Sequence, residues 1–335
     1  MVVMTNSIAS TQGSLREAIS QLSYLRVIFC YRLTSGGRLP FYKGSMLRGQ
    51  FGRAFKKVSC VNPSGVCEGC DVAGNCGYWK VFESPVPQES GRMVKYTAIP
   101  HPFIIRPLDE GRTEFVPETN LEFELTLFGE QTIGWLPYLV RAFEMMGQSG
   151  LGESHLPAVL EEVRTVGQTK PEGCVVFSKA KGLVDVPRPD FLSLNGEESK
   201  NKILTLNFHT PVRIQRNGKI LSQFDFRTFF STLLRRFTNM AYFQAGLEVQ
   251  EDFRTLLASA DDVHTEACSL RRFAWRRYSY RQEQGMDLDG MVGSISFADV
   301  PDDFLPLIRF GEILHVGKNT AFGCGKYLLV ERIRN

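Results

Sequence analysis

The chain has 335 residues, of which 43% are hydrophobic, and a formal net charge of +3 at pH 7. This length suits two domains that each bury a core, and the mild charge does not by itself indicate a nucleic-acid partner, because attraction to phosphate depends on local clustering. The sequence holds no apolar run near the ~20 residues of a membrane-spanning helix and no basic-then-apolar signal pattern at its start, so we expect a cytoplasmic protein without a membrane partner.

The first half of the chain alternates strand and helix patterns. Apolar residues alternate with polar ones in 24–34, which is the period of a half-buried strand, and they recur at helical spacing in 45–58, where Ser45 is placed to cap the helix. Two further strands, a helix and a segment that suits either a strand or a helix follow at 96–106, 120–128, 136–146 and 156–166. With a strand at its end, this half has the order β-α-β-β-α-β.

The second half repeats this order. It opens with a strand at 203–214 and a strongly amphipathic helix at 226–245, which ends near Gly246. Extended segments at 268–280 and 291–297, a short helix after Pro301 and a final strand at 326–333 complete it.

Each β-α-β-β-α-β unit is a ferredoxin-like arrangement. We therefore predict an α+β protein with two ferredoxin-like domains in tandem. The predicted domains cover 1–170, with a cysteine-rich insert at 60–76, and 203–335, and a linker at 171–202 joins them.

A glycine-rich loop precedes the last strand. Gly317, Gly323 and Gly325 let the backbone approach a ligand closely and turn amide groups toward an anion, while Lys318 adds a positive charge. The spacing differs from that of a nucleotide P-loop, because no Gly-Lys-Ser/Thr sequence opens a helix. The loop suits a phosphate backbone, although a tight β-turn explains three glycines equally well.

Residues 270–281 interleave five arginines with four aromatic residues. Guanidinium groups donate paired hydrogen bonds to phosphates and aromatic rings stack on unpaired bases, so this composition favours single-stranded or hairpin RNA over a small metabolite. The predicted RNA-binding residues are Arg271, Arg272, Arg276, Arg277, Tyr278 and Arg281. The alternative is an amphipathic strand with its aromatic residues in the core and its arginines in solvent.

Four of the eight cysteines lie close together in a loop rich in glycine and asparagine. Cys60, Cys67, Cys70 and Cys76 can supply four thiolates to a tetrahedral zinc ion, and a Cys-x2-Cys pair is the usual knuckle of such sites. Four protein ligands leave no open coordination position, so this zinc would be structural. Four free thiols are the alternative, and a redox pair is less favoured because no thioredoxin-like pattern surrounds it.

Several motifs resemble, in the same order, those of the CRISPR precursor-RNA endoribonucleases of the RAMP superfamily. The run 315–327 is similar to their glycine-rich signature, and 208–213, 277–282 and 289–293 resemble further segments. In the first half, 43–52, the cysteine cluster and 78–82 do the same. The resemblance reaches both halves, and it implies paired ferredoxin-like domains that bind a precursor CRISPR RNA repeat, alone or with other CRISPR-associated proteins.

The resemblance also implies a cut that needs no cofactor for catalysis. The 2'-hydroxyl of the RNA attacks the adjacent phosphate and leaves a 2',3'-cyclic phosphate, so the protein must move protons and offset charge. Family members often carry the catalytic histidine on or near the first helix, but 45–58 contains none. Among five histidines we therefore expect His315, which precedes the glycine-rich loop, to act, ahead of His101 and His209. Tyr42 and Lys43 are the titratable neighbours expected to assist.

Two other functions stay open. A RAMP subunit that only binds CRISPR RNA inside an effector complex would explain why the first helix lacks a histidine. The cysteines alone suggest a zinc-dependent enzyme or an unrelated ferredoxin-like module.

Overall fold

The computed structural model describes residues 11–87, 90–109, 111–167, 173–183, 185–194, 202–274, 276–279, 284–287 and 289–333, with the backbone alone for 276–279 and 284–287. The chain divides into two compact units. The N-terminal unit comprises Ser23–Asp190 together with Ala321–Gly323, and the C-terminal unit comprises Met1–Leu22, Phe191–Thr320 and Cys324–Asn335.

A six-stranded antiparallel sheet organises the N-terminal unit, in the spatial order β4-β6-β2-β7-β8-β9. The strand bounds are Phe103–Pro107 (β4), Asn120–Phe128 (β6), Tyr24–Leu33 (β2), Ala158–Thr165 (β7), Val175–Ser178 (β8) and Gly182–Leu183 (β9). Strands β3 (Gly37–Arg38) and β5 (Glu114–Phe115) form a separate pair. The ambiguous segment 156–166 is therefore a strand. Residues 173–183, predicted as part of a linker, instead extend the sheet, because β8 pairs with β7.

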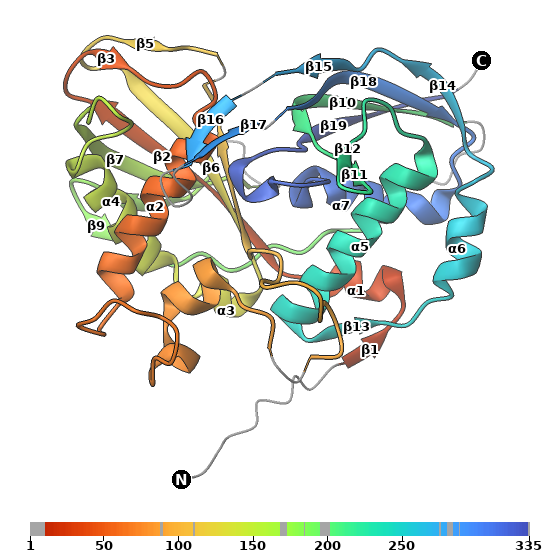
Figure 1. Ribbon diagram of the computed structural model, residues 1–335, viewed down its shortest axis with the longest axis horizontal. Coiled ribbons are helices and arrows are strands. Elements are labelled where there is room, and N and C mark those ends of the chain that lie inside the picture. Colours follow the sequence, from red (N-terminus) through yellow and green to blue (C-terminus); the bar gives the residue numbers. More distant parts are fainter. Residues whose placement is uncertain are drawn as a thin grey trace. The chain divides into compact units, whose positions relative to one another are not determined.

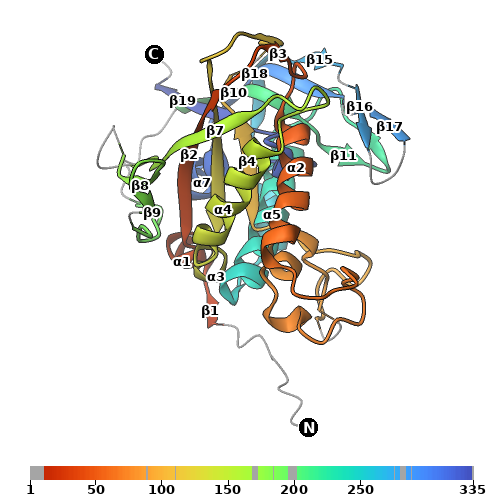
Figure 2. The ribbon, with the colours of Figure 1, turned by 90° about the vertical axis from the view of Figure 1, so that its left-hand side faces the viewer.

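Helices α2 (Gly44–Ser59) and α4 (Leu136–Gln148) cover one face of this sheet (Figure 2). Helix α2 begins one residue before the predicted cap, so Ser45 lies inside the helix, and Lys43 stands at the N-cap, where its side chain does not cap the helix. The short elements η1 (Ala73–Asn75), η2 (Trp79–Glu83) and α3 (Glu130–Ile133) lie in the connections.

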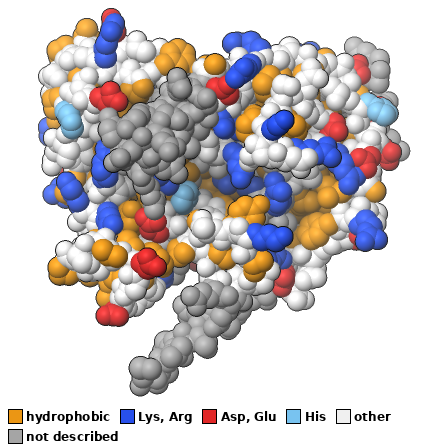
Figure 3. Space-filling model, viewed as in Figure 1, with side chains coloured by type: hydrophobic (Ala, Val, Ile, Leu, Met, Phe, Trp, Pro, Cys, Tyr) orange, Lys and Arg blue, Asp and Glu red, His pale blue; other side chains and the backbone are white. Residues whose placement is uncertain are grey.

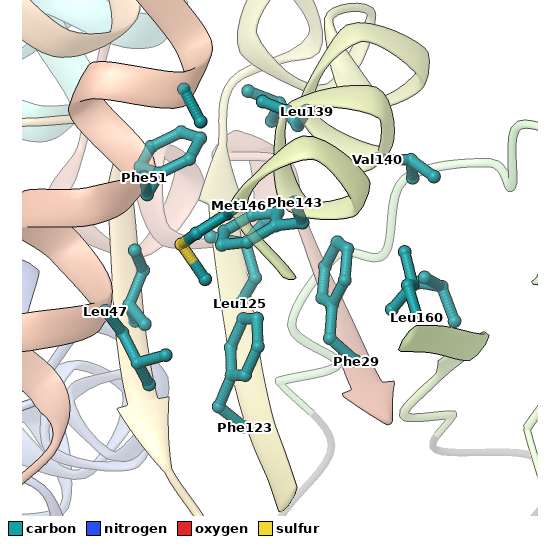
Figure 4. Packing of buried hydrophobic residues seen from close by; sticks show 14 of the residues in the cluster. Phe29, Leu47, Phe51, Phe123, Leu125, Leu139, Val140, Phe143, Met146 and Leu160 are labelled. Atoms are coloured by element: carbon teal, nitrogen blue, oxygen red, sulfur yellow. The ribbon is translucent and has the colours of Figure 1, made fainter. Parts of the chain in front are cut away.

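Alternation along β2 builds the core of this unit. Its core-facing residues, Leu25, Val27, Phe29, Tyr31 and Leu33, are all buried, as the sequence pattern predicted. Phe143 of α4 stacks on Phe51 of α2 with ring centroids 4.8 Å apart, and it lies 4.5 Å from the ring of Phe29 (Figure 4). Burying a large apolar side chain contributes roughly 1.5–3 kcal/mol, so this aromatic cluster fixes α2 on the sheet.

An antiparallel sheet also organises the C-terminal unit, in the order β14-β18-β10-β19, with β15 paired to β18. The strand bounds are His264–Cys268 (β14), Gly290–Ala298 (β18), Lys202–Val212 (β10), Tyr327–Ile333 (β19) and Arg271–Phe273 (β15). The single strand predicted at 268–280 is thus interrupted. Strand β16 (Arg276–Ser279) pairs with β17 (Gln284–Asp287) in a hairpin of its own.

Helices α5 (Phe226–Ala245) and α7 (Leu305–Leu314) pack on this sheet (Figure 1). Helix α5 has the predicted bounds, because Asp225 caps it by accepting a hydrogen bond from the Thr228 amide and Gly246 ends it with φ of 64°. Phe226 of α5 packs against Phe297 of β18 with ring centroids 5.2 Å apart. The remaining elements are β11 (Gln215–Arg216), β12 (Lys219–Ile220), α6 (Phe253–Ser259), η3 (Asp302–Phe304) and η4 (Thr320–Phe322).

The start of the chain belongs to the C-terminal unit, which differs from the predicted first domain at 1–170. The physical reason is that β1 (Thr11–Gly13) pairs in parallel with β13 (Leu247–Val249) and α1 (Leu15–Gln21) follows it. A capping box formed by Ser14 and Glu17 starts α1. Among the residues that the structure describes, no helix combines the length and the hydropathy that crossing a membrane requires.

Candidate functional site

The glycine-rich loop, residues 317–325, connects α7 to β19 and is held by the end of β10. Lys318 donates its amide hydrogen to the Arg213 carbonyl at 2.8 Å, and Gly325 donates to the Pro211 carbonyl at 3.0 Å. Gly325 has φ of 76°, and a β-carbon there would lie 1.9 Å from the carbonyl oxygen of Val316, so only glycine fits. The amides of Lys318 and Gly325 are used inside the protein, and the predicted role of loop amides as phosphate donors does not extend to them.

The accessible part of this loop is its beginning. The side chain of Lys318 is exposed, and Gly317 is partly exposed. Gly323, Cys324 and Gly325 are buried. The predicted RNA contact therefore falls on Gly317 and Lys318 more than on the later glycines.

His315, the expected catalytic residue, lies beneath the loop. It is 2% exposed, and its Nδ1 lies 3.2 Å from the carbonyl oxygen of Cys324. A carbonyl only accepts, so Nδ1 carries the proton and the bond ties the two ends of the loop together. Arg236 of α5 donates through Nε to the adjacent Leu314 carbonyl at 3.0 Å. This burial favours a structural role for His315, because a group that moves protons must reach the RNA.

Tyr42 and Lys43, the expected assistants, precede α2 and are also buried. Lys43 donates from Nζ to the carbonyls of Arg112 at 2.6 Å and Asp109 at 3.3 Å, and burial lowers the pKa of its ammonium group. Tyr42 donates from its hydroxyl to the Phe322 carbonyl at 2.8 Å. Both side chains hold loops in place.

The predicted RNA-binding strand is described in part. Arg271 and Arg272 lie on β15 and are exposed, and Arg272 forms an ion pair with Asp289. Three further predicted residues, Arg276, Arg277 and Tyr278, lie on β16, whose side chains are outside the described residues, and Arg281 lies outside them altogether. The contribution of this hairpin to RNA binding stays a prediction.

The four clustered cysteines lie between α2 and η2. Cys60, Cys67, Cys70 and Cys76 are all free and partly exposed, and burial raises the pKa of the Cys67 thiol. In the part of the chain that the structure describes, no group of three or more His, Cys, Asp or Glu side chains is arranged to hold a metal ion. A structural zinc at these cysteines stays a prediction.

An arginine–histidine pair lies at the surface of α2. Nη2 of Arg48, on α2, is 3.1 Å from Nε2 of His101, which directly precedes β4. Guanidinium groups only donate, so Nε2 of His101 accepts this bond, and in the neutral ring the proton sits on Nδ1. Both residues are partly exposed, although Nε of Arg48 and Nδ1 of His101 are buried.

Aromatic rings position this pair. The guanidinium of Arg48 lies 4.2 Å from the ring centroid of Phe82 and 5.5 Å from that of Phe322. The ring of His101 stacks on Phe103 at 5.5 Å. Phe322 belongs to the glycine-rich loop, so the segment that Tyr42 holds also borders Arg48. The site combines an imidazole, which can move a proton, with a cation that can offset phosphate charge.

The sequence indicated His101 as a second choice but gave no sign of this pairing. The two residues are 53 positions apart, and the contact forms because β4 and α2 pack together in the folded unit. The third histidine that was considered, His209, is exposed on β10, and its amide donates to the Lys326 carbonyl at 3.2 Å.

Two family models match separate parts of the chain. Residues 206–327 match the family of the CRISPR-associated endoribonuclease Cas6, and residues 22–188 match a family described as an N-terminal domain. A comparison with curated proteins finds no match.

Solved structures resemble the chain over most of its length. A product complex of Thermus thermophilus Cas6 has a TM-score of 0.56 at 15% identity and covers 92% of this chain and 100% of that chain. Another structure of the same protein has a TM-score of 0.52 at 15% identity, with 92% and 99% covered. A partial Cas6-RT-Cas1–Cas2 complex has a TM-score of 0.55 at 12% identity, and this chain, covered to 94%, spans 47% of that longer one. The likeness shows that the α+β fold is similar to that of Cas6 structures.

Proposed function

Because the chain belongs to the Cas6 family of RAMP proteins, we propose that it binds a precursor CRISPR RNA and cuts it within the repeat. The observation that carries the proposal is the Arg48–His101 pair beside Phe322 of the glycine-rich loop. The order β4-β6-β2-β7 in one unit and β14-β18-β10-β19 in the other supports a ferredoxin-like assignment for both, since each unit also has the order β-α-β-β-α-β.

In the proposed cut, the phosphoryl group moves within the RNA from the 5'-oxygen of one nucleotide to the 2'-oxygen of the preceding nucleotide. The 2'-oxygen bonds to the adjacent phosphorus, its proton passes to Nε2 of His101, and the bond from phosphorus to the 5'-oxygen breaks. The 5'-oxygen takes up a proton from the imidazolium, and the other product ends in a 2',3'-cyclic phosphate. Arg48 offsets the negative charge that gathers on the phosphorane. Protein groups supply every step, so the proposed mechanism uses no metal ion.

Arg48 also controls when His101 can act. Without RNA, Arg48 donates to the same Nε2 atom that must accept the proton. A phosphate competes for the guanidinium, because the phosphate carries a negative charge that attracts the guanidinium and the neutral imidazole does not. Docking of the RNA backbone on Arg48 therefore frees the base when the substrate arrives.

The same proposal includes partners and location. The Cas6-RT-Cas1–Cas2 complex joins a similar unit to other CRISPR-associated proteins, and we propose that this chain also works beside such proteins. A cytoplasmic site of action goes with that role.

Cleavage of a CRISPR repeat RNA in the presence of EDTA tests the proposal. We expect the wild-type chain to release a product with a 2',3'-cyclic phosphate, and His101→Ala to cut roughly 100-fold more slowly or worse, the usual worth of general acid–base catalysis. His155→Ala is the matched control, because His155 is an exposed histidine of the same unit whose Nδ1 lies 3.4 Å from the Ser149 carbonyl. Equal rates for the two variants contradict the proposed role of His101.

A subunit that binds CRISPR RNA without cutting it is the second candidate. The observation in its favour is that α2 carries no histidine and that Arg48 occupies Nε2 of His101. Tight binding of repeat RNA by a wild-type chain that yields no product would establish this reading.

A further inference from the structure

We propose that a groove on the outer side of α5, separate from the Arg48–His101 pair, binds a stretch of RNA by its ribose-phosphate backbone and prefers RNA to DNA there. The groove has a volume of about 600 Å³ and lies within the C-terminal unit. Helix α5, the β11–β12 hairpin and helix α6 line it. This inference rests on the proposed function, which identifies RNA as the ligand.

The hairpin forms one wall of the groove. Its turn residues, Asn217 and Gly218, have φ of 50° and 79°, which is the geometry of the tight two-residue turn that an Asn-Gly sequence favours. The side-chain Nε2 of Gln215 donates a hydrogen bond of 2.8 Å to the Gly218 carbonyl, which stabilises the turn. This short, braced hairpin places Arg216 against the groove.

Arginine side chains supply the charge. Arg216, Arg227 and Arg235 line the groove, and Lys and Arg side chains gather over α5 and the hairpin on this face (Figure 3). Arg227 is occupied, since it donates to the Leu257 carbonyl and pairs with Asp261. Arg216 and Arg235 are exposed, and neither lies within ion-pair distance of a carboxylate that the structure describes, although Asp225 of the same groove attracts Arg216. Two guanidinium groups therefore remain to donate to phosphate oxygens.

Hydroxyl groups on α5 supply hydrogen-bond acceptors. The hydroxyls of Ser231 and Thr232 donate to the Thr228 carbonyl at 3.2 and 2.7 Å, and Thr238 donates to the Arg235 carbonyl at 3.2 Å. A carbonyl only accepts, so each hydroxyl hydrogen is already used and the oxygen offers lone pairs. These oxygens suit a donor, and they do not suit a phosphate.

The groove thus holds hydrogen-bond donors for an anion next to hydrogen-bond acceptors for a hydroxyl group. The backbone of RNA repeats this pair of groups at every nucleotide. The sugar-phosphate chain of RNA carries a 2'-hydroxyl next to each phosphate, whereas DNA lacks that donor. Thr228, Ser231, Arg235 and Thr238 recur every three or four positions, with Thr232 next to Ser231. Ten residues of helix extend about 15 Å, enough for a few nucleotides. Phe253 of α6 also lines the groove and offers a ring on which a base can stack.

Binding of the full chain to labelled oligonucleotides tests the proposal, with twelve-residue oligouridylate and its deoxy counterpart as probes. We expect Arg216→Ala combined with Arg235→Ala to weaken oligouridylate binding tenfold or more. The slope of log K against log salt should become shallower by about 1.4, since each phosphate contact on a single strand contributes about 0.7. The matched control is Lys219→Ala with Arg254→Ala, which removes two exposed charges from β12 and α6 that do not line the groove.

The hydroxyl variants test the preference for RNA. We expect Thr232→Val to weaken binding of oligouridylate about fivefold, the worth of one hydrogen bond, and to leave binding of the deoxy probe unchanged. The proposal is overturned if the double arginine variant binds no worse than its control, if Thr232→Val weakens both probes equally, or if the wild-type chain binds neither probe.

Cleavage separates this proposal from the proposed function. If the wild-type chain cuts repeat RNA while the groove variants bind oligouridylate like the wild type, the groove is wrong and the function stands. If the groove variants lose oligouridylate binding while no RNA is ever cut, the groove stands and the endoribonuclease proposal fails.

Discussion

Replacing Glu124 by glutamine tests how the sheet of the N-terminal unit tolerates a buried charge. The side chain of Glu124 on β6 is 6% exposed. Arg26 of β2 donates to its two carboxylate oxygens at 2.8 and 3.1 Å, and Arg106 of β4 donates at 2.7 Å. Burial by itself raises the pKa of this carboxyl, but the bonds from the two arginines outweigh it and hold the pKa of Glu124 well below its ordinary value.

The expected loss follows from what remains after the change. Removing one partner of a buried ion pair costs ~3–5 kcal/mol, because the other charge is left uncompensated. The side chains of Arg26 and Arg106 are 24% and 19% exposed, so water compensates them in part. We therefore expect the lower end, a loss of about 3 kcal/mol in the free energy of unfolding for Glu124→Gln.

Urea unfolding at pH 7 measures this loss. The matched control is Glu122→Gln, because Glu122 pairs with Arg164 at 2.8 Å but is 34% exposed, and such a pair is worth at most about 1 kcal/mol. A depressed folded-state pKa stabilises the protein above the ordinary carboxyl pKa of ~4.3, and this stabilisation is lost as the pH falls. The gap between wild type and Glu124→Gln should therefore shrink below about pH 4. Equal losses for the two variants, or a gap that widens on acidification, would refute the reasoning.

Three further predictions concern the loops. Gly325→Ala should destabilise the C-terminal unit by several kcal/mol in thermal unfolding, since its β-carbon would meet the Val316 carbonyl at 1.9 Å; an unchanged midpoint would contradict this. Tyr42→Phe should cost ~1 kcal/mol for the lost bond to Phe322 and keep cleavage within about tenfold of wild type, whereas abolished cleavage in a folded variant would make Tyr42 catalytic. If the cysteine loop holds a structural zinc, metal analysis should find one zinc per chain that Cys67→Ser removes; a metal-free wild-type chain would leave four free thiols.

Local patterns were sufficient for the elements whose capping and periodicity agree. Helix α5 was predicted with its observed ends, because Gly246 and the amphipathic stripe of phenylalanines indicate the same helix, and the structure adds Asp225 as its N-cap. Strand β2 followed from its alternation. Helix α1 was missed although Ser14 and Glu17 form a capping box, a signal that is readable in the sequence.

Local sequence patterns did not predict which distant segments pair as strands. The segment 268–280 has the composition of one strand, but its first part pairs with β18 and its last part with β17. Likewise, β8 is short and lies in a stretch rich in glycine and lysine, and only its pairing with β7 makes it part of a sheet. Such partners are set by tertiary packing, which overrides weak local preference.

In the candidate site, too, local features were predicted and contacts between distant residues were not. The family resemblance was confirmed, and it located the glycine-rich loop correctly next to the last strand. We propose His101 ahead of His315 as the catalytic histidine, because His315 is next to the loop in sequence but buried beneath it in space. His101 contacts Arg48 only in the folded unit. The groove on α5 depends on side-chain hydrogen bonds of Ser231 and Thr232, which the sequence alone does not predict.

Chemical rescue of the His101→Ala variant tests the central claim most directly. Single-turnover cleavage of repeat RNA is followed with and without free imidazole, for His101→Ala and for His315→Ala. If His101 moves the proton, imidazole restores cyclic-phosphate product to His101→Ala and gives no comparable gain to His315→Ala. Wild-type rates for His101→Ala without imidazole, or rescue confined to His315→Ala, would contradict the account.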